Sequence, residues 1–148
     1  MVKPRQVQAE GVSTAGKLVY AHFMFIDLTA FSAPQQHALF DLLILAMYAD
    51  GHLTTFDDAK LQTLLAAMGA TEKADRQTEF DAAVTRIQPV MRSIHKAKAQ
   101  ALSLAKAFTS RSQHKQVFEA VEEIMTFDHH VSNWENTLLM ELRMKFRL

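Results

Sequence analysis

Two acidic turns in this sequence carry the residues best suited to chemistry. The first is "MYADGHLTTFDDAKL" (47–61), and the second is "MTFDHHVSNWENTLL" (125–139). Each runs from the end of an apolar, helix-like segment through a short polar stretch into another amphipathic segment. Aligned with each other, the two stretches place acidic residues at matching positions. These carboxylates are Asp50 and Asp57 in the first turn and Asp128 and Glu135 in the second.

Helix capping explains part of this repeated pattern. Thr54 with Asp57, and Ser132 with Glu135, each place a hydroxyl three residues before an acid. In such a capping box the hydroxyl accepts a main-chain N–H of the first helical turn, and the acid bonds back to the N–H of the cap. The acids also favour the positive end of the helix dipole. The pattern therefore predicts that a helix starts at each turn.

Capping does not explain the first acid of each turn. Asp50 and Asp128 follow the C-terminal ends of predicted helices, where the dipole disfavours a carboxylate. One explanation is an Asx-type turn, in which the side chain accepts main-chain N–H groups two or three residues later. The other is a divalent cation, because calcium and magnesium prefer oxygen ligands. The predicted ligands are Asp50, Asp57, Asp128 and Glu135, and neither turn has the spacing of an EF-hand.

Three histidines lie in the same turns and leave a further alternative open. His52, His129 and His130 would add nitrogen ligands and shift the preference of a metal site toward zinc or nickel. The simpler interpretation is that these imidazoles are solvated residues of a loop. A bound calcium, magnesium or zinc ion is accordingly a hypothesis, and no cofactor is certain.

The segments that position the turns are predicted to be helices. Only four glycines and three prolines occur in 148 residues, which favours helices joined by short connections. The predicted fold is all-α: a single compact domain of about seven helices around one core, in two loosely similar halves. Residues 1–16 are polar and without periodicity, so we expect a loosely ordered N-terminal segment followed by a helical domain over 17–148.

Local signals predict where the first helices begin. The aromatic segment 17–31 is expected to form a buried first helix. Ser32 and Gln35 form a capping box, and Pro34 suits the first turn, where its missing N–H costs little. The helix that follows is apolar on most sides, which is typical of a central helix. Its apolar residues are Leu39, Leu42, Leu43, Leu45, Ala46 and Met47.

Further signals divide the remainder of the chain. Gly69 is expected to end a helix in a left-handed conformation, Thr71 to open the next one, and Pro89 to kink or end it. An alanine-rich stripe follows at steps of three and four residues, which suits close helix packing. Ser110 and Ser112 bracket a break before the last two helices.

The two turns and the helical spacing around them resemble the tellurite-resistance TerB-like family over residues 35–147. The usual signature of that family is an Ala-Asp-Gly-x-Ile-Ser-x-x-Glu turn, with a weaker second copy later in the chain. Here the first copy reads "ADGHLTTFD" (49–57) and the second reads "FDHHVSNWE" (127–135).

This resemblance implies an all-α domain whose paired acidic turns have been proposed to bind metal. It also implies a bacterial cytoplasmic protein that is linked to stress or tellurite resistance and acts through protein partners. Related domains occur inside J-domain co-chaperones. This chain has no His-Pro-Asp tripeptide, so the resemblance does not extend to that activity.

Catalytic signatures are missing from the sequence. Without cysteine there is no thiol nucleophile, thiolate metal site or disulfide. The phosphate-binding loop, the Ser nucleophile elbow and the zinc-protease helix motif are also absent. We therefore predict a non-enzymatic helical binding module that acts through an unknown protein partner. The alternative is a divalent-metal-binding or metal-sensing stress protein.

Charge and hydropathy bound the remaining classes of partner. Sixteen basic residues balance sixteen acidic ones, so no overall field attracts nucleic acid or an anionic membrane. The apolar stretches are shorter than the roughly 20 residues of a spanning helix, and the N-terminus lacks the apolar core of a signal peptide. We expect a cytoplasmic protein that does not insert into a membrane. Assembly into a homo-oligomer is an alternative that the sequence leaves open.

Overall fold

The computed structural model describes residues 26–49, 59–126 and 132–148. These residues form six α-helices and two short 3-10 helices, and none of them forms a strand. The all-α prediction is confirmed, with slightly fewer helices than the seven expected. The elements are η1 (Leu28–Ala30), α1 (Ala33–Ala49), α2 (Ala59–Ala67), α3 (Lys73–Ile87), η2 (Gln88–Arg92), α4 (Ile94–Ala105), α5 (Arg111–Met125) and α6 (Asn133–Phe146).

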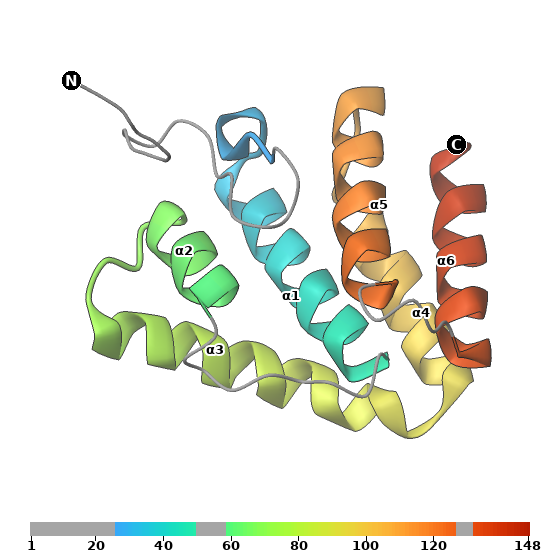
Figure 1. The fold of residues 1–148 in the computed structure, drawn as a ribbon, viewed down its shortest axis with the longest axis horizontal. Coiled ribbons are helices and arrows are strands. Elements are labelled where there is room, and N and C mark those ends of the chain that lie inside the picture. Colours follow the sequence, from blue (N-terminus) through green and yellow to red (C-terminus); the bar gives the residue numbers. More distant parts are fainter. Residues whose placement is uncertain (1–25, 50–58, 127–131) are drawn as a thin grey trace.

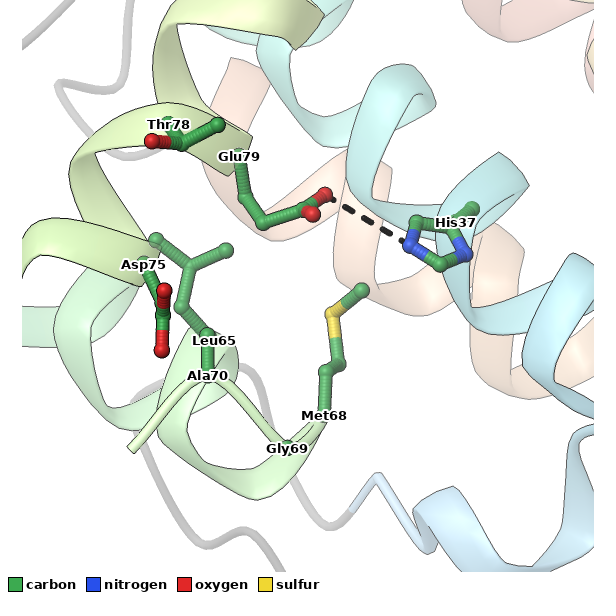
Figure 2. A pocket seen from close by; sticks show the side chains of 8 residues that line it. All are labelled: His37, Leu65, Met68, Gly69, Ala70, Asp75, Thr78 and Glu79. Atoms are coloured by element: carbon green, nitrogen blue, oxygen red, sulfur yellow. Dashed lines mark ion pairs between the residues drawn. The ribbon is translucent and has the colours of Figure 1, made fainter. Parts of the chain in front are cut away.

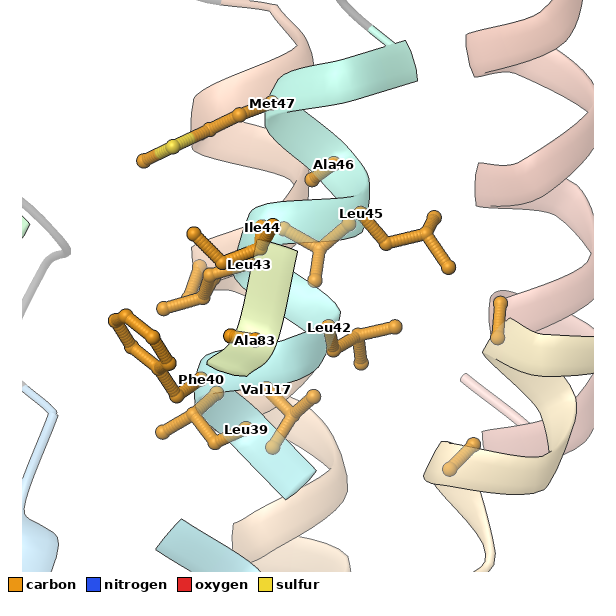
Figure 3. Packing of buried hydrophobic residues seen from close by; sticks show 14 of the residues in the cluster. Leu39, Phe40, Leu42, Leu43, Ile44, Leu45, Ala46, Met47, Ala83 and Val117 are labelled. Carbon is orange, nitrogen blue, oxygen red and sulfur yellow. The ribbon is translucent and has the colours of Figure 1, made fainter. Parts of the chain in front are cut away.

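Helix α1 is the central element, as its apolar composition predicts. All residues from 39 to 47 are buried, so side chains on every side of the helix contact protein. Helices α3, α4, α5 and α6 all pack against it. Figure 3 shows these side chains radiating from α1, with Ala83 of α3 and Val117 of α5 among the residues packed around them.

The helices around α1 have a simple arrangement. α5 runs parallel to α1, α6 returns antiparallel beside α5, and α3 runs crosswise near the end where α1 and α5 terminate (Figure 1). Side chains near the starts of α1 and α5 confirm the parallel direction, because Gln35 hydrogen bonds to both Gln113 and the Ala107 carbonyl. α4 packs against α1 and α6, whereas α2 packs chiefly against α3.

Buried alanines explain how α4 fits into this bundle. Ala97, Ala101 and Ala105 lie on one face of α4 and are fully buried. Such small side chains let neighbouring helices approach closely. The alanine-rich stripe predicted from the sequence is therefore the packing face of α4. Within the described ranges, no helix has the length and hydropathy required to cross a membrane.

Among the helix starts that the structure describes, three are formed by a capping box. Ser32 and Gln35 start α1, Ser110 and Gln113 start α5, and in each box the hydroxyl and the side-chain carbonyl accept main-chain N–H groups. The third box, formed by Ser132 and Glu135, starts α6. The boxes of α1 and α6 confirm the prediction. The box of α5 has the same spacing but was predicted only as a break.

The ends of α2 and α3 lie close to the glycine and the proline that predict them. Gly69 has a φ of +109°, a conformation that glycine adopts at little cost. The N–H of Ala70 bonds to the carbonyl of Leu65, and that of Gly69 to Ala66, which together form a Schellman motif after α2. Pro89 follows the end of α3 and lies inside the 3-10 helix η2.

Two boundaries differ from the sequence-based expectation. The predicted first helix over 17–31 is wrong in its described part, where Leu28–Ala30 forms a single 3-10 turn capped by the Asp27 carboxylate. Its described part is anchored in the core by Ile26, Leu28 and Phe31, which are buried. The helix expected to open at Thr71 begins at Lys73, because the Thr71 N–H bonds back to the Gly69 carbonyl.

Candidate functional site

Three of the four predicted metal ligands lie outside the described residues. These are Asp50, Asp57 and Asp128, and Thr54 and the three turn histidines also lie outside. The fourth, Glu135, sits in the first turn of α6 and is only 2% exposed. Its Oε1 atom accepts the Ser132 N–H at 2.8 Å, so the predicted capping role is confirmed. Among the described residues, no three His, Asp or Glu side chains gather closely enough to hold a metal ion.

A metal site shared by the two turns requires that they lie near each other, and the described helix ends bear on this requirement. α1 ends at Ala49 and α5 ends at Met125, and the two helices run in the same direction. The helix termini that precede the two turns therefore lie at the same end of the bundle. The proximity of the turns themselves stays a prediction.

A pocket lies where α1, α2 and α3 meet, with a volume of about 340 Å³. Figure 2 shows Met68 and Leu65 of the α2 region facing Glu79 of α3 and His37 of α1. The His37 Nε2 atom lies 3.5 Å from the Glu79 Oε1 atom. The lining residues are His37, Leu65, Met68, Gly69, Ala70, Asp75, Thr78 and Glu79.

This pocket offers little for catalysis. Its volume is near the lower limit of small-molecule sites, which span roughly 300–1,000 Å³. Both members of the His37–Glu79 pair are exposed to solvent, and such exposed pairs contribute little energy. The pocket can accept a small group, but it holds no buried acid and base in contact.

A second polar pair fixes the same helix crossing. Arg86 on α3 donates from Nε and Nη2 to the two carboxylate oxygens of Asp41 on α1, at 2.9 and 2.8 Å. The hydrogen bond to Asp41 is the largest cause of a raised pKa at Arg86, and the nearby negative charges add to it. Asp41 is buried and the guanidinium is half-exposed. The pair therefore has a structural role in holding α3 against α1.

The largest exposed apolar side chains among the described residues lie on α6. Met140 is 54% exposed and Met144 is 68% exposed, and a spacing of four residues places them one above the other on the helix. Arg143 and Arg147 fall within the same outer side of α6. We refer to Met140, Arg143, Met144 and Arg147 as the α6 face. The opposite side of α6 packs into the core through Leu138, Leu142 and Phe146.

The start of α5 adjoins this face. Arg111, the first residue of α5, donates a hydrogen bond from Nη1 to the main-chain carbonyl of Arg147, at 3.3 Å. The guanidinium carbon of Arg143 lies 4.9 Å from the ring centre of Phe118 on α5, in a cation–π contact. Three arginines from two helices therefore gather at one end of the molecule. We refer to Arg111, Arg143 and Arg147 as the arginine cluster.

Sequence reasoning did not single out this surface. The sequence-based predictions centred on the two acidic turns, and α6 entered them only through its capping box. The available signal was the spacing of Met140 and Met144, because they fall opposite the core positions of the same helix.

The basic residues between positions 92 and 106, in contrast, lie mostly exposed along η2 and α4. Arg92, Lys96 and Lys106 are exposed and Lys98 is half-buried, and they accompany the buried alanine stripe of the same segment. Nothing in this region contributes an aromatic platform for bases, which single-stranded nucleic acid would require.

Comparison with known protein families, with curated proteins and with solved structures finds no match to this chain.

Proposed function

We propose that this protein is a non-enzymatic helical binding module that acts through a protein partner in a stress response. The resemblance of its two acidic turns to the TerB-like family supports the link to stress and tellurite resistance. The observation that carries the binding role is the α6 face, where two methionines one helical turn apart are exposed on a helix anchored in the core.

The buried polar side chains of the described residues favour binding over catalysis. Asp41 is held by Arg86, and Glu135 by the cap of α6. Gln113 donates to the Ala30 carbonyl at 2.6 Å and accepts the Thr109 N–H at 3.0 Å. Each of these three groups is engaged in holding segments together, so the interior has a structural function and the surface is left for recognition.

Methionine is well suited to a recognition surface. Its unbranched thioether side chain is flexible and polarizable, so it adapts to differently shaped partners. Single exposed apolar residues are common, but Met140 and Met144 are adjacent on one helix. Because α6 is anchored by Leu138, Leu142 and Phe146, the two methionines are presented from a fixed backbone. Such presentation lowers the ordering cost of binding.

The proposed setting follows from the resemblance. A TerB-like stress protein would act in the bacterial cytoplasm, and a chain without cysteine is compatible with that compartment. The partner would be another protein of the same response, and self-association is a second form that such contacts could take.

Site-specific photo-crosslinking in cells of the native host tests this proposal. A photoreactive amino acid is placed at Met140, and separately at Lys73, an exposed residue where α3 begins, far from α6 (Figure 1). We expect a discrete protein adduct from position 140 and none of the same mass from position 73. Equal adducts from both positions, or none from position 140, would contradict the proposal.

A further inference from the structure

We propose that the partner presents an acidic amphipathic segment, whose carboxylates bind the arginine cluster while its apolar side chains cover Met140 and Met144. This inference rests on the proposed function and names the chemistry of the partner. It follows from a positive charge that has no ion-pair partner among the described residues and lies beside an exposed apolar surface.

The arginine cluster has no acidic counterpart within its own helices. No Asp or Glu lies three or four residues from Arg111, Arg143 or Arg147 in α5 or α6. Within the described part of the chain, none of the three arginines takes part in an ion pair. Arg143 and Arg147 are four residues apart, a spacing at which like charges repel each other on a helix. Among the described residues, no acidic side chain offsets the repulsion between Arg143 and Arg147.

The position of Arg111 indicates that stability is not the reason for the cluster. A cation in the first turn of a helix opposes the positive end of the helix dipole, and Arg111 is the first residue of α5. Arg143 and Arg147 lie at the C-terminal end of α6, where the dipole favours them. The hydrogen bond from Arg111 to the Arg147 carbonyl nevertheless joins the start of α5 to the end of α6, where the other two arginines lie.

Carboxylates are the natural ligands of such a cluster. The guanidinium group presents several N–H donors in a planar fork that matches a carboxylate, and it is always charged. Arg111 uses Nη1 for the Arg147 carbonyl, and Arg143 lies over the Phe118 ring. These contacts hold the side chains of Arg111 and Arg143 in place, which reduces the entropy lost when a ligand binds.

The neighbouring methionines favour a protein segment over a nucleic acid. Single-stranded nucleic acid binds best where aromatic side chains beside a basic patch stack on its bases, and the exposed large apolar residues among those described are Met140 and Met144. An amphipathic peptide, by contrast, places apolar side chains at helical spacing beside acidic ones. Its acidic side would contact the arginine cluster, and its apolar side would contact Met140 and Met144.

A defined peptide tests the inference with the full-length protein. The probe is a fluorescently labelled helical peptide with leucines at steps of three and four residues and glutamates elsewhere. The comparison peptide keeps the leucines and replaces every glutamate with lysine. Fluorescence anisotropy measures affinity, and methyl NMR spectra of the methionines report which of them the peptide contacts. We expect the acidic peptide alone to bind and to shift the signals of Met140 and Met144.

Two triple variants with the same change in net charge locate the binding site. Arg111→Gln/Arg143→Gln/Arg147→Gln removes the arginine cluster, and Arg92→Gln/Lys96→Gln/Lys106→Gln removes three exposed charges elsewhere. We expect the first variant to bind the acidic peptide about tenfold more weakly, since each exposed charge pair contributes up to about fivefold. The second variant should bind as the wild type does. Thermal melts verify that both variants fold.

Several results would overturn the inference. These are failure of the acidic peptide to bind, equal binding of the lysine peptide, or equal loss in the two triple variants. Tighter binding of a single-stranded oligonucleotide or of phosphatidylserine vesicles would assign the arginine cluster to another ligand. A crosslinked partner whose segment at Met140 is not acidic would refute this inference and leave the proposed function intact. Absence of an adduct at Met140 would refute the proposed function itself.

Discussion

Arg86 of α3 donates two hydrogen bonds, at 2.9 and 2.8 Å, to the buried carboxylate of Asp41 on α1, where the two helices cross. Such bidentate geometry restricts both the distance and the orientation of the partners. The pair lies in the same α1–α3 interface as the His37–Glu79 pair beside the pocket. It therefore holds α3 against α1 at that interface.

Replacement of Arg86 should lower the stability of the fold, because the buried Asp41 carboxylate would lose its partner. Arg86→Met leaves the Asp41 carboxylate without its two donors, and we expect a loss of about 1–3 kcal/mol in the free energy of unfolding. Because apolar replacement of both partners removes that penalty, Asp41→Leu/Arg86→Met should recover most of the loss. Urea titration of the three proteins measures these differences. An unchanged midpoint for Arg86→Met would show that the pair has no structural role.

The capping serines should contribute measurably and similarly. Ser132→Ala and Ser110→Ala each remove a hydroxyl that accepts an N–H of the first helical turn, so we expect each to cost about 0.5–2 kcal/mol. Thr54→Ala should have the same effect if the predicted box of the first turn forms. Ser103→Ala, on the exposed side of α4, is the control and should be neutral or slightly stabilising. Equal melting temperatures for all these proteins would contradict the assignment of the caps.

The backbone at Arg147 offers a stabilising substitution. Arg147 ends α6 in the left-handed conformation, with φ of +57°, which glycine adopts without the steric cost that other residues incur. Arg147→Gly should therefore increase stability by about 0.5–1 kcal/mol. Arg147→Ala loses the same guanidinium without relieving the backbone, so it should not gain stability. A melting temperature for Arg147→Gly at or below that of Arg147→Ala would refute this account of the helix end.

Glu135 allows the metal hypothesis to be separated from capping. Because its Oε1 atom accepts the Ser132 N–H, Glu135→Ala should destabilise the fold by about 0.5–1.5 kcal/mol. We expect the same decrease in melting temperature in chelator and in millimolar calcium, magnesium or zinc. A decrease that appears only when a cation is present would instead identify Glu135 as a metal ligand.

Local signals in the sequence predicted most of the helix boundaries. Such signals determine a helix end through contacts within a few residues, so their effect can be predicted without knowledge of the rest of the fold. Examples are Gly69, Pro89 and the capping box of Ser132 and Glu135. The difference at 17–31 has a local cause. Asp27 accepts the Thr29 N–H and thereby caps a 3-10 turn in a segment whose aromatic residues suggested a longer helix.

Contacts between distant segments could not be predicted in the same way. Asp41 and Arg86 are 45 residues apart, and Arg111 and Arg147 are 36 apart, so each pairing depends on how the helices pack. The acidic turns stood out in the sequence because they repeat, whereas Met140 and Met144 gain meaning only once the opposite side of α6 is known to be buried. Of the predicted site residues, Glu135 alone lies in the described ranges, and its cap is confirmed.

Binding of the crosslinked partner to a variant of the α6 face tests the central claim most directly. Met140→Asp/Met144→Asp places charge where apolar contacts are proposed, and both side chains are exposed, so the fold should be unaffected. Isothermal titration calorimetry with the purified partner measures affinity, and a thermal melt of the variant verifies folding. Our account predicts at least about a tenfold loss of affinity, roughly 1.4 kcal/mol, at an unchanged melting temperature. Wild-type affinity in this variant would contradict it.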